Sequence, residues 1–454
     1  MTDLLAADRE VRSFGWQRVG AALLHTRSTS LLVGAMSLFI AATALDAYSV
    51  GPIPIQWIAS CAVLLLFLFV LLTQPVGRIP NMRLLALFGG WCLVVTAVHV
   101  LLHDYAALMP SAATSSYGVF VALRFAAILV FAAVAVLTYT LLQHGRQEQI
   151  LRVLTVIGLV VSLAALYIYV AQVHGLPELP RTRLGTGGGE VTTVTYTYPF
   201  HRATGTFREP SFLAVWLIVP LFASIALRRS PLNIPTVVMG GTLLLTGSMT
   251  GIAACVLGVL GALVLARPRG MRWARTVGET AVAVFLAFLI FQVIAVPTEG
   301  GSTNLISIIR MRLWPVATGG LAESNRSYVY EFLQLRPVPL LGWGLGHAQL
   351  LFSQYLGTDV PVSFLNLYLS LLYAGGLPGL TLLLCWLVRP LLQVGALGMR
   401  RAVSLSLFAA ISGYVAWLAM FYVQAEELTP MFGIVFAWLV YEIEEERRRL
   451  RQPQ

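Results

Sequence analysis

The chain alternates between long apolar runs and short polar segments. Apolar runs of about 17–25 residues match the hydrocarbon thickness of a bilayer when they form α-helices. Because a helix satisfies its own backbone hydrogen bonds in lipid, this pattern predicts an all-α polytopic membrane protein. We expect about twelve spans, at about 29–48, 56–74, 84–103, 118–143, 153–173, 211–227, two within 236–266, 277–296, 364–388, 403–423 and 429–443.

The apolar run from 236 to 266 is too long for one ordinary span. Arginines precede it at 228 and 229 and follow it from 267, so both of its ends favour the same side of the membrane. The run therefore needs an even number of crossings. We predict two short helices that turn near Gly247–Gly251, where glycine, serine and threonine interrupt the apolar pattern.

The distribution of arginine assigns the loops to sides. The short loops at 75–83 and 144–152 carry arginine, whereas those at 49–55 and 104–117 carry none. By the positive-inside rule the arginine-bearing loops are cytoplasmic. The same alternation places both termini, 1–28 and 444–454, in the cytoplasm, and two long loops, 174–210 and 297–363, on the outer side of the membrane.

Within the long loops, a Thr/Tyr/Val run at 191–198 is compatible with a short strand. An amphipathic piece at 303–314 and a second segment at 324–335 are candidate helices. We find no soluble domain and no repeat of fixed period, so the chain from 1 to 454 forms a single integral membrane domain.

The composition supports a membrane protein and limits the kinds of partner that we expect. Of the 454 residues, 58% are hydrophobic and 11% charged, which leaves too little polar surface for a soluble domain. The net charge of +10 would suggest nucleic acid in a soluble protein, but most of it lies in short loops next to lipid headgroups. We therefore expect membrane lipids and no nucleic acid as partners. No histidine or cysteine spacing suggests a metal, and we expect no cofactor.

Arginine is usually sparse on the outer side, yet the two long loops carry it repeatedly. Arg202, Arg208, Arg326 and Arg336 are flanked by helical or turn-forming residues; the others are Arg181, Arg183, Arg310 and Arg312. Each could be solvated or bound to a lipid phosphate. The planar guanidinium binds two phosphate oxygens at once, so we predict that the first four converge on one outer cavity and bind a diphosphate.

A further arginine, Arg124, lies inside the fourth span near its outer end. Burying an arginine in hydrocarbon costs roughly 3 kcal/mol or more, so Arg124 should face a cavity or a partner unless it reaches the outer headgroups. We include it among the candidate diphosphate ligands.

Two residues are candidates for acid–base chemistry. Glu209 stands between Arg208 and Pro210 at a helix start, where it could alternatively cap the helix or pair with Arg208. His347 follows a glycine-rich turn and could activate a hydroxyl as a general base, or simply pack in that turn. Other outer polar residues are expected to be interfacial or solvated: Asp46, His99, His103, Asp104, Glu426 and Glu427.

Four segments, in this order, resemble the O-antigen ligase and polymerase superfamily, which are bacterial membrane glycosyltransferases of the GT-C type. Segment 202–211 resembles the stretch that leads into a span in O-antigen polymerases. Segment 245–251 is similar to the Thr-x-Ser-Arg-x-Gly turn, with Met249 where arginine is usual. Segments 339–346 and 366–380 resemble the Pro-x-x-Gly-x-Gly-x-Gly turn and the Asn-x-Tyr-Leu opening of the next span.

The resemblance implies a metal-independent transferase of the bacterial inner membrane that uses undecaprenyl-diphosphate-linked oligosaccharides, and it makes the outer loops 174–210 and 297–363 periplasmic. The arginines would neutralise the departing diphosphate, and a base would deprotonate the acceptor hydroxyl. A chain-length regulator and a flippase are implied as possible partners. In the ligases a histidine precedes the asparagine of the last motif, whereas this chain has Leu365. This departure favours a polymerase of repeat units over a ligase that transfers the glycan to another acceptor such as lipid A-core; alternatively, His347 or Glu209 takes the role of that histidine.

A transporter or flippase for the same lipid is the alternative from another class. Such proteins often show internal repeats and broken helices in corresponding halves, and we find neither an internal repeat nor a matching charge-rich loop in the first half.

Overall fold

A computed structural model describes most of the chain. The described residues are 29–51, 53–73, 79–113, 115–178, 181–182, 201–266, 295–298, 301–304, 307, 327–398 and 403–451.

Long apolar helices make up most of the described structure. Eight of them are long and apolar enough to cross a membrane: α2 (Ile55–Thr73), α3 (Met82–Leu102), α4 (Tyr117–Gln143), α5 (Gln147–His174), α6 (Pro210–Arg228), α8 (Met249–Ala266), α13 (Leu367–Gly398) and α14 (Leu405–Val423). Thr29–Thr43 and α7 (Ile234–Leu245) are shorter apolar helices, and α15 (Pro430–Arg451) is apolar in its first half and charged in its second. The predicted class, an all-α polytopic membrane protein, is confirmed.

The short elements lie between these helices. Strands β1 (Ser49–Val50) and β2 (Ile53–Pro54) pair antiparallel, as do β3 (Ala295–Thr298) and β4 (Gly301–Asn304). A 3-10 turn, η1, covers Tyr105–Leu108, and the second long loop contains α11 (Ser327–Leu335) and α12 (His347–Leu356).

Most sequence predictions fall on described elements. The run 236–266 divides into α7 and α8 at the predicted glycine–serine turn, and α11 confirms a helix within 324–335. The predicted span 277–296 lies outside the described residues up to 294, and its last two positions belong to β3. The first two residues of the predicted helix 303–314 belong to β4, and of its other residues only Ser307 is described. The predicted strand at 191–198 lies outside the described residues.

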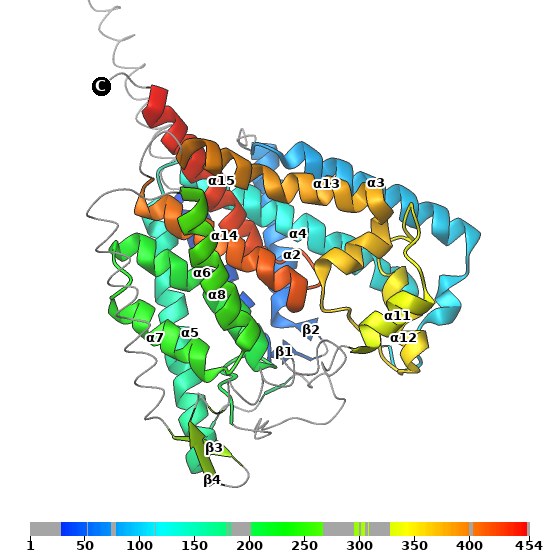
Figure 1. Ribbon diagram of the computed structural model, residues 1–454, viewed down its shortest axis with the longest axis horizontal. Helices are drawn as coiled ribbons and strands as arrows, with labels where there is room; N and C mark the ends of the chain where they lie inside the picture. Colours follow the sequence, from blue (N-terminus) through cyan, green and yellow to red (C-terminus); the bar gives the residue numbers. More distant parts are fainter. Residues whose placement is uncertain are drawn as a thin grey trace, which may run out of the picture.

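Polar contacts join the helix ends that the charge pattern assigns to the cytoplasm. The carboxylate of Glu442 in α15 accepts hydrogen bonds from Gln147 of α5, Ser406 of α14 and Trp438. Figure 1 shows the C-terminus at this end of the bundle, whereas α11 and α12 lie towards the other end. The ends of α5, α14 and α15 thus lie together, as the charge pattern predicts for these three, and the side of the membrane that they face stays a prediction.

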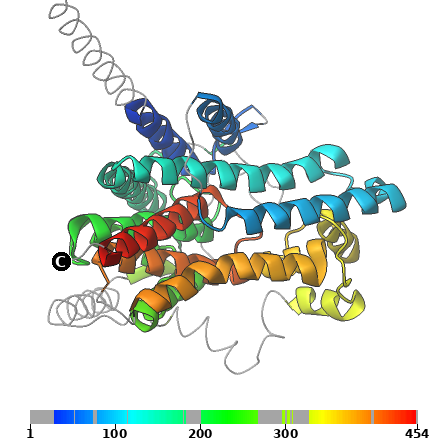
Figure 2. The ribbon, with the colours of Figure 1, turned by 90° about the horizontal axis from the view of Figure 1, so that it is seen from above.

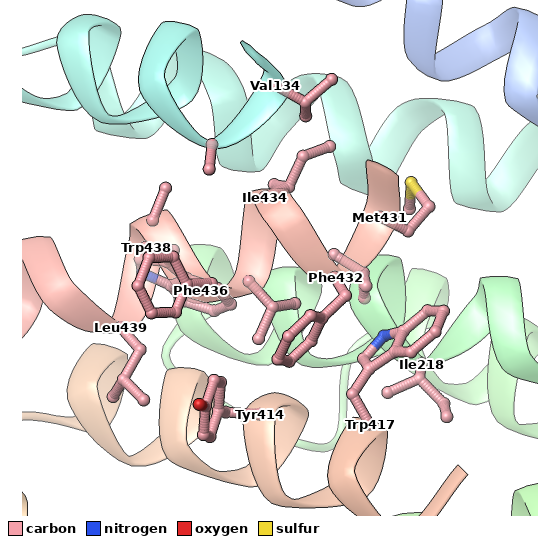
Figure 3. Packing of buried hydrophobic residues seen from close by; sticks show 14 of the residues in the cluster. Val134, Ile218, Tyr414, Trp417, Met431, Phe432, Ile434, Phe436, Trp438 and Leu439 are labelled. Carbon is pink, nitrogen blue, oxygen red and sulfur yellow. The ribbon is translucent and has the colours of Figure 1, made fainter. Parts of the chain in front are cut away.

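The core of the bundle is formed around α15, which lies between α4 on one side and α13 and α14 on the other (Figure 2). Phe432 of α15 is fully buried. Its ring centroid lies 4.7–6.2 Å from those of five other rings: Phe131, Trp386, Tyr414, Trp417 and Phe421. Figure 3 shows Phe432 facing Tyr414 and Trp417 of α14. Lipid is as apolar as these side chains, so close packing rather than hydrophobic transfer holds the helices together here.

Helix α8 approaches α14 closely through a glycine. A Cβ atom placed on Gly258 would lie 2.3 Å from the carbonyl oxygen of Ser412. We expect Gly258→Ala to force the helices apart and to lower the free energy of unfolding by about 1–3 kcal/mol, as overpacking does. Gly240→Ala is the control, because nothing lies within 4 Å of a Cβ atom there. Unfolding of both variants in detergent would test this; equal stability would contradict it.

Candidate functional site

The segment 201–209, here called the arginine loop, is tied into the helix bundle on two sides. The amide of Ala47 donates to the carbonyl oxygen of Thr206 at 3.0 Å, and the Thr206 hydroxyl donates to that of Ala44 at 2.6 Å. On the other side, the amide of Ala203 donates to the carbonyl oxygen of Leu245 in α7 at 3.0 Å. The loop is therefore held between the helix Thr29–Thr43 and the α7–α8 turn.

Both arginines of this loop are anchored by acceptors. Arg202 Nε donates to the carbonyl oxygen of Thr246 at 2.7 Å. Arg208 Nε donates to Asp46 Oδ2 at 3.1 Å, and its guanidinium lies 5.5 Å from the ring centroid of Phe212. Asp46 is buried, so the expectation that it is merely interfacial is wrong. Sequence reasoning missed this pair because its members are 162 residues apart.

Glu209 occupies the N-cap position of α6, with Pro210 as the first helical residue. Its backbone is extended, and its side chain makes no capping hydrogen bond. Instead the Ser211 hydroxyl donates to Glu209 Oε2 at 3.3 Å. The carboxylate thus lies at the start of α6, next to the hydroxyl of Ser211.

His347 is the centre of a second group, the histidine cluster, which consists of His99, His103, Tyr105, Tyr117 and His347. The ring of Tyr105 stacks on that of His347 with 4.0 Å between centroids, and the His99 ring lies 6.4 Å away. Within the described part of the chain, no group of three or more His, Cys, Asp or Glu side chains is placed to hold a metal ion.

Both ring nitrogens of His347 are occupied. Nδ1 bonds to the carbonyl oxygen of Trp343 at 2.5 Å, and Nε2 bonds to the Tyr117 hydroxyl at 2.6 Å. Since a carbonyl only accepts, Nδ1 carries the proton and Nε2 accepts from Tyr117. Burial lowers the pKa of His347 to about 4, partly opposed by the Trp343 carbonyl. Of the two alternatives for His347, the geometry favours packing in the turn over action as a base.

Low pH should therefore lower the stability of the fold, because protonation of His347 is unfavourable in the folded state. Its folded pKa of about 4 lies below the ordinary value of 6.5, so the neutral form is favoured by folding. The stabilisation is fully present above pH 6.5 and is lost as the pH falls towards 4. Thermal unfolding in detergent across this range should show the loss, and His347→Gln should flatten it. An equally steep pH dependence in the variant would contradict this origin.

The loop between α14 and α15, residues 424–429, is here called the bridging loop. Glu427 forms an ion pair with Arg124 of α4, and Glu426 accepts hydrogen bonds from Gln349 of α12 and Ser370 of α13. Glu426 and Glu427 are half-buried and paired, so the prediction that they are solvated is wrong. Arg124, which the sequence predicts to face a cavity or a partner, is thus paired with Glu427.

The bridging loop also reaches the arginine loop. Gln424 Nε2 donates to the hydroxyl of Ser211, next to Glu209, at 3.0 Å. One short loop thus contacts the start of α6 on one side and α4, α12 and α13 on the other.

Of the other outer-loop arginines, Arg181 is buried against the arginine loop, where it donates to Thr204 and to the carbonyl oxygen of Gly205. Arg336 is exposed at the end of α11, and its carbonyl oxygen accepts a hydrogen bond from Tyr373 of α13 at 2.6 Å. Helix α11 packs with α12 and α13 in a hydrophobic cluster of its own, around Phe332. Arg326 lies outside the described residues. Convergence of the four loop arginines on one cavity therefore stays a prediction.

The four segments that resemble the glycosyltransferase motifs form two hydrogen-bonded pairs. Segments 202–211 and 245–251 are joined by the bonds of Arg202 and Ala203 described above. In the other pair, the amide of Trp343 donates to the carbonyl oxygen of Tyr373 at 2.7 Å, and that of Gly344 to Ala374 at 2.9 Å. The bridging loop contacts the first pair at Ser211 and the second at Ser370.

No family model matches the chain, and no curated protein matches it.

Proposed function

We propose that the protein is an inner-membrane glycosyltransferase that polymerises undecaprenyl-diphosphate-linked oligosaccharide repeat units on the periplasmic side. The observation that carries this proposal is the grouping of the four motif-like segments. They are far apart in sequence, yet they lie in two hydrogen-bonded pairs that the bridging loop connects. A transferase needs such a meeting point, because donor and acceptor must be held together.

The arginine loop is the proposed site for the donor diphosphate. Arg202 and Arg208 are held by hydrogen bonds, so little side-chain freedom is lost when an anion binds. Arg208 lies beside the N-terminus of α6, whose amide groups favour a negative charge, and Arg202 lies at the α7–α8 turn. When the glycosidic bond to the diphosphate breaks, negative charge develops on the leaving oxygen, and fixed cations at this position stabilise it.

The placement of arginine favours a transferase over a flippase. A flippase would need cationic side chains along a path through the bilayer. In the described spans, arginines such as Arg83, Arg124 and Arg228 instead lie near helix ends. The ligase alternative uses the same donor chemistry and differs in the acceptor; Leu365, which stands where the ligases have histidine, favours the polymerase.

Purified protein in lipid nanodiscs, given a lipid-diphosphate-linked oligosaccharide, tests the proposal. Lengthened products without a second acceptor support polymerisation. Transfer only to added lipid A-core would replace the polymerase with a ligase. If no new glycosidic bond forms with either acceptor, the proposal that the protein is a glycosyltransferase is contradicted. Translocation of the intact lipid in sealed vesicles would then identify a transporter.

A further inference from the structure

A small pocket lies between α4, α12, α13 and the bridging loop. Its polar lining consists of Arg124, Gln349, Ser370, Glu426 and Glu427, and the rest of its wall is apolar. The space has room for about one water-sized group. A single hydroxyl group of a larger molecule fits such a pocket, whereas a whole sugar ring does not.

The two glutamates of this pocket have different partners. Glu427 is paired with the guanidinium of Arg124, which compensates its charge. Glu426 Oε1 accepts hydrogen bonds from two neutral donors, the amide of Gln349 and, at 3.3 Å, the hydroxyl of Ser370, while the charge of Arg124 acts on Glu426 as well as on Glu427. Gln349 Nε2 also donates to Ser370 Oγ at 2.9 Å, and both side chains are buried. The Glu426 carboxylate is thus held in place.

In the bridging loop, Glu426 is only two residues from Gln424, which contacts the start of α6 next to the proposed donor site. Gln424, two positions before Glu426, is bonded to Ser211 at the start of α6. The arginine loop ends immediately before this helix. A hydroxyl at the pocket and a diphosphate on the arginine loop would therefore both lie next to the same short loop.

We propose that Glu426 accepts the proton of the acceptor sugar hydroxyl during glycosyl transfer. This inference rests on the proposed function and deepens it. The Glu426 carboxylate takes the proton, and the acceptor oxygen forms a bond to the anomeric carbon of the donor sugar. The bond from that carbon to the diphosphate oxygen breaks, and the lipid diphosphate leaves with the electron pair. The proton then passes from Glu426 to water.

The test compares Glu426→Gln with wild type in the elongation assay. We expect kcat to fall about 100-fold, within the range for a lost general base, and KM for the lipid-linked donor to change less than about threefold. The residual activity should lack the acid limb of the wild-type pH profile. Glu331→Gln is the matched control, because Glu331 is exposed on α11, outside the pocket and the bridging loop, and should retain wild-type kinetics.

The outcomes separate the inference from the proposed function. If wild type forms no glycosidic bond, the function and the inference fail together. If wild type is active and Glu426→Gln keeps its kcat and pH profile, the inference alone fails. A purely structural role would instead lower the melting temperature, leave the pH profile unchanged and give no recovery with formate. We expect added formate, a small carboxylate, to restore part of the activity of Glu426→Ala.

Discussion

Replacing Arg208 with methionine should lower the rate of glycosyl transfer about 100- to 1,000-fold. This is the range seen when one fixed donor that stabilises developing negative charge is removed. Arg208 is held by Asp46 and the ring of Phe212 at the start of α6, so its charge is already in place before the diphosphate departs. The measurement is the initial rate of chain elongation from a lipid-diphosphate-linked oligosaccharide.

Stability has to be separated from activity in this experiment. Removing Arg208 leaves the buried carboxylate of Asp46 without its cation, which costs about 3–5 kcal/mol in other proteins. The double variant Arg208→Met/Asp46→Asn removes the uncompensated charge and should recover stability without recovering activity. Arg152→Met, at the opposite end of the bundle, should leave the rate unchanged. A double variant with wild-type activity would exclude Arg208 from the diphosphate site.

Phe432→Ala should lower the free energy of unfolding by about 3–5 kcal/mol, the cost of truncating a fully buried phenylalanine. The side chain is in contact with rings from α4, α13 and α14, so its loss leaves a cavity where four helices meet. Because these rings support one another, the surrounding helices cannot easily collapse into the space. Unfolding with denaturing detergent in mixed micelles measures the effect.

Phe69→Ala serves as the comparison for Phe432→Ala. Phe69 lies on α2 with 60% of its surface exposed, and it sits on a face of the bundle available to lipid. Its truncation should cost less than about 1 kcal/mol, since lipid chains replace the lost contacts. Similar losses in the two variants would show that the aromatic cluster contributes no special packing.

Sequence alone predicted the spans because their pattern is local. The run of apolar residues that forms α2 begins and ends within one or two residues of its predicted bounds, 56–74. The α7–α8 turn was predictable because glycine and serine interrupt an apolar run whose flanking arginines demand an even number of crossings. Each of these signals lies within a single stretch of chain.

The partners of the polar residues could not be predicted in the same way. Asp46 and Arg208 are 162 residues apart, and Arg124 and Glu427 are 303 apart. In a hydropathy pattern, a glutamate in a short outer loop looks solvated whether or not an arginine of a distant helix lies beside it. Hydropathy likewise gave no sign that Tyr117 occupies the basic nitrogen of His347. The candidate residues were identifiable by type, but their roles depended on the packing of the helices.

The carboxylate of Glu442 binds donors from α5 and α14 as well as from its own helix α15, at the end of the bundle away from the bridging loop. At the other end of the same two helices the bridging loop, only six residues long, joins α14 directly to α15. The two helices are thus tied together at both ends, so in any conformational change they should move as one rigid pair against their neighbours.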